Sequence, residues 1–137
     1  MPLRVHPSNL VILSGDGFRF RRMPGRATAD PLEGAAPDGF AMRIARLDGN
    51  ERRSPHRHPH SQEAIFVVSG AGMLWEDGEA RRFVQGDSAL IEPGVAHATV
   101  PDPDTTMELV CFFPHPDLPA NTEEVPGVVV NEGRPAG

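Results

Sequence analysis

The sequence contains no lysine and no tyrosine, and its 137 residues include one cysteine and one tryptophan. Without lysine, a Schiff-base mechanism on a lysine amine is excluded, and without tyrosine no phenol can act as an acid or a radical. The lone cysteine, Cys111, cannot form an internal disulfide bond, and its neighbours in MELVCFF predict a buried apolar strand. We therefore expect a reducing compartment.

Long apolar runs are also missing. No stretch approaches the length of a membrane-spanning helix, and the apolar stretch near the N-terminus is too short for a convincing signal peptide. We expect a soluble, cytoplasmic protein without a membrane partner.

Acidic residues outnumber basic ones by 19 to 13, which gives a formal net charge of −6. Residues 1–60 hold ten Arg and six acidic residues, net +4, whereas residues 61–137 hold three Arg and thirteen acidic residues, net −10. The overall negative charge disfavours nucleic acid as a partner, because binding a phosphate backbone requires a dense basic face. The arginine-rich first half could still bind a small anion.

The 15 prolines and 14 glycines leave mostly short uninterrupted stretches, which disfavours long helices more than short strands. Runs rich in Val, Ile and Phe recur between Gly, Pro or Asp residues, and this spacing predicts an all-β sandwich or barrel in a single domain. The Asp77-Gly78 pair predicts a two-residue hairpin turn. The expected strands are residues 10–13, 18–22, 40–47, 64–68, 73–75, 81–84, 88–91, 97–100 and 106–113.

Composition divides the chain into three regions. Residues 1–39 combine N-terminal strands with a Pro/Gly-rich loop at 24–39, which we interpret as a lid or a dimer-contact arm. Residues 40–113 form the predicted barrel, and residues 114–137 form an acidic, Pro-rich tail that we expect to be extended or partly disordered. His6 and His115 lie in the terminal regions and are expected to be solvated.

Four of the six histidines lie between positions 56 and 97. On an extended strand His56 and His58 share a face, about 6.6 Å apart at roughly 3.3 Å per residue, so both rings could lean onto one metal ion. Pro59 favours a turn, after which Glu63 could open the next strand and point at the same centre. His97 follows a Pro-Gly turn and begins a further strand, which could bring a third imidazole.

These residues carry a family resemblance. The pattern His56-x-His58-x4-Glu63-x6-Gly70, followed by Gly86-x7-Gly94-x2-His97, resembles the two motifs of the cupin superfamily, with the short spacer typical of small microbial cupins. The resemblance implies a small jelly-roll β-barrel, the double-stranded β-helix. It also implies one divalent metal ion per chain, held by His56, His58, Glu63 and His97.

The sequence departs from the family pattern at two turn positions. Glu92 stands where a proline is usual, and Pro101 stands where the second motif usually ends in asparagine. Neither position belongs to the implied ligand set, which is therefore complete.

Three imidazoles and a carboxylate, without a thiolate, suit Fe, Mn, Ni, Co, Cu or Zn, and spacing does not choose among them. Up to two positions of an octahedral ion would stay open for water, dioxygen or substrate. The site is therefore expected to be open rather than purely structural.

Two further side chains are candidate substrate contacts. Arg46 shares a strand face with Phe40, Met42 and Ile44, and if that face lines the barrel, Arg46 could bind a substrate carboxylate near the mouth; an exposed strand-end arginine is the equal alternative. We expect His60 at the rim rather than as a fourth imidazole ligand. The sequence does not decide which face of residues 106–113 lines the pocket.

The leading hypothesis is a metal-dependent cupin enzyme with dioxygenase-like chemistry on a small oxygenated organic substrate. One alternative is a Zn-dependent Lewis-acid cyclase or isomerase, similar to single-domain cupins of bacterial aromatic-polyketide pathways. Another is a non-catalytic, metal-dependent module that binds a small molecule. Because small cupins usually pair through sheet edges, and an uncovered edge strand needs protection, we predict a homodimer.

Overall fold

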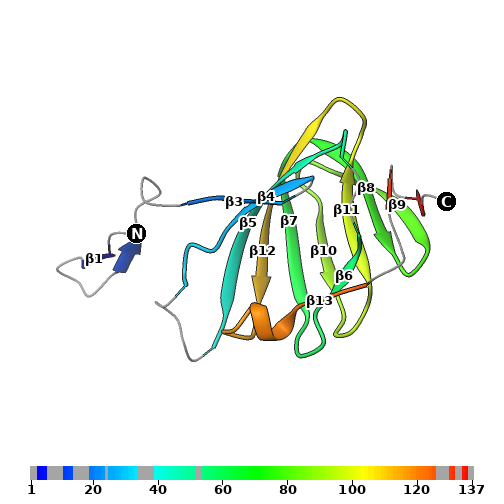
Figure 1. Ribbon diagram of the computed structural model, residues 1–137. Coiled ribbons are helices and arrows are strands. Elements are labelled where there is room, and N and C mark those ends of the chain that lie inside the picture. The colour runs from blue at the N-terminus through cyan, green and yellow to red at the C-terminus, as the bar shows by residue number, and fades with distance from the viewer. Residues whose placement is uncertain are drawn as a thin grey trace.

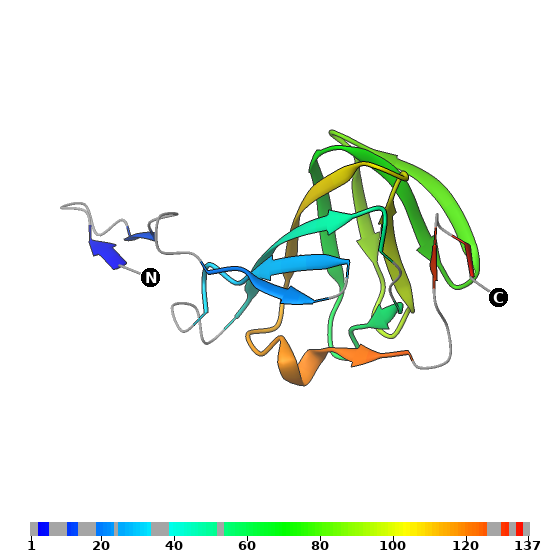
Figure 2. The same cartoon turned by 45° about the horizontal axis from the view of Figure 1, so that its top comes forward.

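The computed structural model consists of two antiparallel β-sheets that enclose a common core (Figures 1 and 2). The structure describes residues 3–5, 11–13, 19–23, 25–33, 39–51, 54–125, 130–131 and 134–135. Within these residues the chain forms strands and one short 3-10 helix, η2 (Pro119–Asn121). None of the described elements is a helix long and apolar enough to cross a membrane. The predicted all-β barrel is confirmed.

Each sheet mixes strands that are distant in sequence. The first has the order β10 (Ser88–Ile91), β7 (Glu63–Ser69), β12 (Thr106–Phe113), β5 (Ala41–Asp48), β4 (Arg26–Ala29), β3 (Arg21–Met23). The second has the order β13 (Glu123–Glu124), β6 (His56–Arg57), β11 (His97–Pro101), β8 (Ala71–Glu76), β9 (Glu79–Val84). Two separate pairs are β1 (Leu3–Val5) with β2 (Val11–Leu13), and β14 (Val130–Asn131) with β15 (Arg134–Pro135).

Side chains of the central strands alternate between the core and the outer surface, as the pleat requires. In β7 the buried positions are 63, 65 and 67, and in β12 they are 107, 109, 111 and 113. The structure thus answers the question left open for residues 106–113: the face with Met107, Leu109, Cys111 and Phe113 points inward. The predicted burial of Cys111 is confirmed.

The same alternation decides which face of residues 40–47 points inward. In β5 the residues buried against the core are Ala45 and Leu47, whereas Arg46 is exposed. The bulkier apolar set, with Phe40 and Met42, lies on the outer face together with Arg46. Ala45 and Leu47 belong to the core cluster that also contains Leu109 and Phe113, and Arg43 on the same inner face lines the cavity described below.

Several turns follow the prediction. Asp77 and Gly78 have φ angles of 47° and 92° and join β8 to β9 as a tight hairpin. Gly94, at φ 80°, makes the turn before His97, which opens β11, and Glu63 opens β7 after the turn at Pro59.

Parts of the predicted loop and of the predicted tail form strands that pair with neighbouring strands. Residues 26–29, expected to belong to a loop, form β4 because Gly25 accepts a backbone hydrogen bond from Asp48, and β4 then pairs along β5. The tail expected to be extended or disordered contains η2 and β13, and β13 pairs with β6. Residues 24 and 34–38 lie outside the described residues, so the assignment of 24–39 as lid or dimer arm stays a prediction. His6 also lies outside them.

Two glycines have the same backbone φ angle but differ in how closely other atoms pack against them. Gly70 and Gly86 both have φ of +90°, but a Cβ on Gly70 would fall on the backbone oxygen of Thr106, whereas a Cβ on Gly86 meets no atom within 4 Å. We expect Gly86→Ala to lower the free energy of unfolding by about 1 kcal/mol, from backbone strain alone. Gly70→Ala should cost about 3 kcal/mol, because the steric clash adds to the strain. Urea unfolding of both variants measures the difference, and equal losses would contradict the observed close approach.

Candidate metal centre

Four ligating side chains converge between the two sheets. One ligand atom from each of His56, His58, Glu63 and His97 lies within 4.8 Å of all the others. His56 on β6 and His97 on β11 are register partners on adjacent strands, and their ring centroids are 4.6 Å apart. Glu63 comes from the opposite sheet, at the start of β7. The structure therefore gathers the four residues named by the sequence motifs into one cluster.

Glu63 lies at the centre of this cluster as a buried carboxylate. Its Oε1 is 2.7 Å from His97 Nε2 and 3.2 Å from His58 Nε2, and its side chain is 4% exposed. Burial alone would raise the pKa of Glu63, but the imidazoles of His58 and His97 outweigh burial and hold the pKa well below its usual range. Glu63 is therefore an anion at neutral pH.

The histidines respond to burial and to this anion in different ways. Burial lowers the pKa of His97, yet the hydrogen bond and charge of Glu63 dominate and raise it overall. For His56 burial prevails, helped by the neighbouring His97, and its pKa falls well below the usual value. A neutral His56 offers a lone pair at neutral pH, which is the form that binds a metal ion.

Backbone carbonyls orient two of the imidazoles. His58 Nδ1 donates to the carbonyl oxygen of Asn121 at 2.8 Å, and His97 Nδ1 donates to that of Val95 at 3.0 Å. With Nδ1 engaged in this way, the Nε2 atoms point at Glu63 and the centre of the cluster. Carbonyl partners of this kind are the usual supports of metal-binding histidines.

The residues fit a divalent metal ion. His58 Nε2 is buried and has no hydrogen-bond partner among the described residues, since its approach to Glu63 lacks hydrogen-bonding geometry. A buried nitrogen aimed at an anion and two further imidazoles needs a partner that accepts its lone pair. Three nitrogens and one carboxylate oxygen, with no thiolate, form a donor set for a first-row transition metal or zinc.

A cavity of about 50 Å³ adjoins the cluster. Its polar lining outside the cluster includes Arg26, Thr28 and Arg43. Its apolar lining comes from both β5 and β12 and from β7: Ala45, Leu47, Ile65, Leu109, Cys111 and Phe113. A ligand in this cavity would have imidazoles on one side and apolar side chains on the other.

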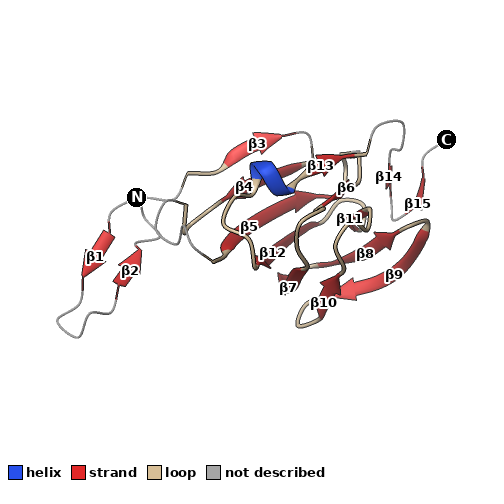
Figure 3. Ribbon diagram, turned by 90° about the horizontal axis from the view of Figure 1, so that it is seen from below, coloured by secondary structure: helices blue, strands red, loops and turns tan. Residues whose placement is uncertain are grey.

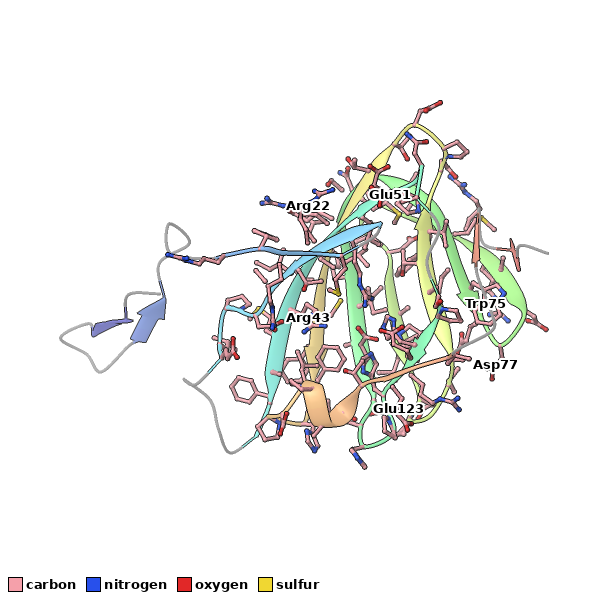
Figure 4. All side chains as sticks on the ribbon, in the orientation of Figure 1. Arg22, Arg43, Glu51, Trp75, Asp77 and Glu123 are labelled. Atoms are coloured by element: carbon pink, nitrogen blue, oxygen red, sulfur yellow. The ribbon has the colours of Figure 1, made fainter. Side chains whose placement is uncertain are left out.

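Sequence reasoning assigned no role to the two arginines that line this cavity. Figure 4 shows Arg43 among the side chains inside the barrel, where it makes a two-pronged ion pair with Asp30 at 2.7 and 3.0 Å. Arg26 lies beside His56, and burial lowers the pKa of its guanidinium in spite of the Glu124 carboxylate. The alternation of side chains along β5 would have placed Arg43 inside the barrel if the face with Ala45 and Leu47 had been taken as the inner one.

The two predicted substrate contacts lie outside the cavity. Arg46 is 60% exposed, pairs with Glu108 at 2.8 Å and lies 4.1 Å over the ring of Phe20. Of the two alternatives for Arg46, the structure therefore agrees with the exposed arginine and not with the contact in the barrel mouth. His60 is exposed, and its ring stacks on His115 with centroids 5.7 Å apart. Neither residue lines the cavity beside the cluster.

Asn121, a residue that sequence reasoning missed, connects the C-terminal segment to the cluster. It is fully buried; its side chain donates to Ser61 Oγ and accepts from the backbone N–H of His60, both at 2.8 Å, while its carbonyl oxygen holds His58. In Figure 3, η2 lies at the lower end of the barrel, the end that faces the viewer. The tail therefore supports the site.

We predict that Asn121→Ala weakens Zn(II) binding by about ten- to a hundredfold, because the carbonyl that orients His58 loses its side-chain anchors. It should also lower the free energy of unfolding by about 1–3 kcal/mol, since buried polar groups lose their partners. Competition with a chromogenic chelator measures the affinity. Asn50→Ala is the matched control, since Asn50 accepts a backbone hydrogen bond from Asp104 on the surface. Equal losses of affinity in both variants would contradict a positioning role.

Comparisons with known proteins agree with this architecture. Residues 43–113 match the cupin domain family. Protein SchB from Streptomyces halstedii is 33% identical over 117 residues, which cover 82% of this chain and 80% of SchB. The polyketide cyclase RemF from Streptomyces resistomycificus superposes with a TM-score of 0.63 at 22% identity, covering 96% of this chain and 85% of RemF.

A second solved structure, the nucleoside dehydratase Pac13 from Streptomyces, superposes with a TM-score of 0.69 at 15% identity, over 83% of this chain and 89% of Pac13. The family match spans both sequence motifs and the strands β6, β7 and β11, which carry His56, Glu63 and His97. Together with the β-barrel and the buried histidine–glutamate cluster, it identifies the chain as a member of the cupin domain family.

Proposed function

We propose that the protein is a metal-dependent enzyme that acts on a small oxygenated organic molecule, with one divalent ion per chain held by His56, His58, Glu63 and His97. The observation that carries this proposal is the cluster's position, since these four side chains line a cavity together with apolar side chains and two arginines. A structural metal site would have its donors closed off by protein, whereas this one opens onto space for a ligand.

The chain's own residues would prepare such a site in three ways. Glu63 brings one negative charge, the Asn121 and Val95 carbonyls hold two imidazoles in place, and the apolar lining keeps bulk water out. A bound divalent ion supplies Lewis-acid polarisation of a substrate oxygen, and a redox-active one also supplies chemistry with dioxygen.

Of the two chemistries, we favour a Lewis-acid cyclase or isomerase. The similarity to the polyketide cyclase RemF extends over 96% of this chain and supports this choice. The cavity of about 50 Å³ accommodates only a few atoms, so it would hold the reacting end of such a substrate. Dioxygenase-like chemistry is the second candidate, supported by a donor set that suits iron or manganese as well as zinc.

We expect protein purified without chelators to carry about one divalent ion per chain, measured by plasma mass spectrometry. Zinc would support the cyclase or isomerase, and iron, manganese, nickel, cobalt or copper would support the dioxygenase. Glu63→Gln keeps the side-chain shape but removes the charge, and should lose most of the metal, whereas Glu92→Gln, a change at an exposed glutamate, should keep it. Near-zero metal that added Fe(II) or Zn(II) does not restore would overturn the proposal.

Turnover separates an enzyme from a binding module. His97→Gln should abolish turnover of a substrate found by screening catechols, diketones and small acids, while His60→Gln, a change outside the cavity, should leave turnover intact. Wild-type protein without turnover of any screened substrate, together with a loss of thermal stability in His97→Gln, would instead indicate a structural metal in a non-catalytic module.

We further propose that two copies of the chain associate through the outer face of the six-stranded sheet. Phe66, Leu90 and Phe112 are 46%, 58% and 42% exposed on this face, and the register places Leu90 and Phe112 on either side of Ala64. Leu90 belongs to β10, which no strand of the described residues pairs on its outer side, so the patch continues to an edge of the sheet. The three side chains of the patch carry no charge. Two copies of a chain with net charge −6 can therefore meet at this patch without placing like charges against each other.

Light scattering after gel filtration tests this association. The wild type should show twice the mass of one chain. Phe66→Glu buries a charge in the interface and should shift the mass to that of a single chain. Gln85→Glu, at an exposed position in the turn between β9 and β10, should remain dimeric. A wild-type protein with the mass of one chain would rule out the homodimer.

A further inference from the structure

The two arginines that line the cavity differ in how their charge is compensated. Arg43 pairs with Asp30 through two short hydrogen bonds of 2.7 and 3.0 Å, and the Asp30 side chain is itself only 10% exposed. Asp30 also accepts a hydrogen bond of 2.8 Å from Arg21, whose side chain is 64% exposed. Because two donors of Arg43 are already engaged by this buried carboxylate, Arg43 has few donors left for a ligand.

Arg26 is equally buried but lacks such a partner. Its side chain is 18% exposed, and its polar contacts among the described residues are long: 3.4 Å to His56 Nδ1, 3.5 Å to Glu124 Oε1 and 3.8 Å to Met23 Sδ. Glu124 is 59% exposed, so solvent screens the pair. A largely buried guanidinium with no short charge-assisted hydrogen bond is destabilising, and a ligand that accepts its hydrogen bonds would compensate it.

A metal ion would remove one of these contacts. A neutral imidazole has one lone pair and one N–H, so when the metal takes the lone pair of His56, neither ring nitrogen can accept from Arg26. Only the long contacts to Glu124 and Met23 would remain. The guanidinium of Arg26 would then face the cavity next to a metal-bound imidazole, with its donors free for a ligand.

Thr28 provides a second unpaired group on the same wall. It lies two residues after Arg26 on β4, so both side chains share the face that lines the cavity. Thr28 is 2% exposed, and its Oγ1 has no hydrogen-bond partner among the described residues. A buried hydroxyl without a hydrogen-bond partner is destabilising, and a ligand that forms a hydrogen bond with it would remove this cost.

We infer that Arg26 and Thr28 form an anion subsite that binds the carboxylate of a small organic acid beside the metal centre, and this inference rests on the proposed function. The charge of the site favours an anionic ligand, because Glu63 alone does not neutralise a divalent ion and Arg26 adds a further positive charge. The charge of Arg43 is compensated by Asp30, which also pairs with the exposed Arg21. A planar guanidinium fork matches the two oxygens of a carboxylate. The substrate class is therefore a carboxylate whose second oxygen function reaches the metal, and Arg26 takes the role that the sequence suggested for Arg46.

The test uses full-length protein loaded with Co(II), whose visible absorption bands report ligands entering the metal site. Pyruvate and pyruvamide are the probes, because they have nearly the same shape and differ in charge. We expect the wild type to bind pyruvate at least tenfold more tightly than pyruvamide. Arg26→Gln should remove this preference while keeping one Co(II) per chain, and Arg26→Lys should restore part of it. Arg46→Gln is the matched control and should retain the full preference.

Thr28→Val tests the second group, since it keeps the shape and removes the hydroxyl. We expect pyruvate affinity to fall several-fold, with the melting temperature of the free protein unchanged or raised because an unsatisfied hydroxyl is gone. A clear drop in melting temperature would show that the hydroxyl already has a structural partner and would remove Thr28 from the subsite.

The outcomes separate this inference from the proposed function. Stoichiometric Co(II) with no preference for pyruvate, or a preference that survives in Arg26→Gln, overturns the anion subsite and leaves the metal enzyme standing. An equal loss in Arg46→Gln also overturns it, because that result would reflect overall charge. A wild type that holds no Co(II) overturns the proposed function, and the subsite with it.

Discussion

The carboxylate of Glu63, buried between imidazoles, is the constraint on which the rest of the site depends. Removing a carboxylate from water costs several kcal/mol, and the charge persists only where close partners compensate it. Here the partners come from the opposite sheet and the segment after β6, so the two sheets must meet in one register for Glu63 to be satisfied. The requirement for charge compensation thus couples the packing of the barrel to the geometry of the candidate metal centre.

The chain surrounds this cluster with backbone as much as with side chains. Val95 and Asn121 contribute carbonyl oxygens, and Val125 donates its backbone N–H to the carbonyl of Pro55, which ties the C-terminal segment to the strand that carries His56. The segment that contains Asn121 and Val125 therefore packs beside His56 and His58 of the cluster. Its packing, rather than its sequence pattern, gives it a part in the site.

The inner and outer faces of the six-stranded sheet carry different kinds of side chain. Inside, β4 and β5 bring Arg26, Thr28 and Arg43 toward the cluster, so the inner wall carries polar groups among apolar ones. Outside, the same sheet exposes Phe66, Leu90 and Phe112. Because side chains alternate along each strand, one sheet can serve a ligand on one face and a second protein surface on the other.

The sequence by itself determined the β architecture and the Asp77-Gly78 turn, because these depend on local turn chemistry and on the spacing of short apolar runs. The gathering of His56, His58, Glu63 and His97 was implied by the resemblance of the two motifs to the cupin family. Only the tertiary structure decided the inner face of β5, where both faces hold apolar residues and one arginine, so that alternation alone could not choose between Arg43 and Arg46. It also decided β4, β6 and β13: strands of two to four residues have too little periodicity of their own and form because a neighbouring strand completes their hydrogen bonds. The roles of Arg26, Thr28 and Asn121 belong to this second group, since each depends on contacts between segments far apart in the chain.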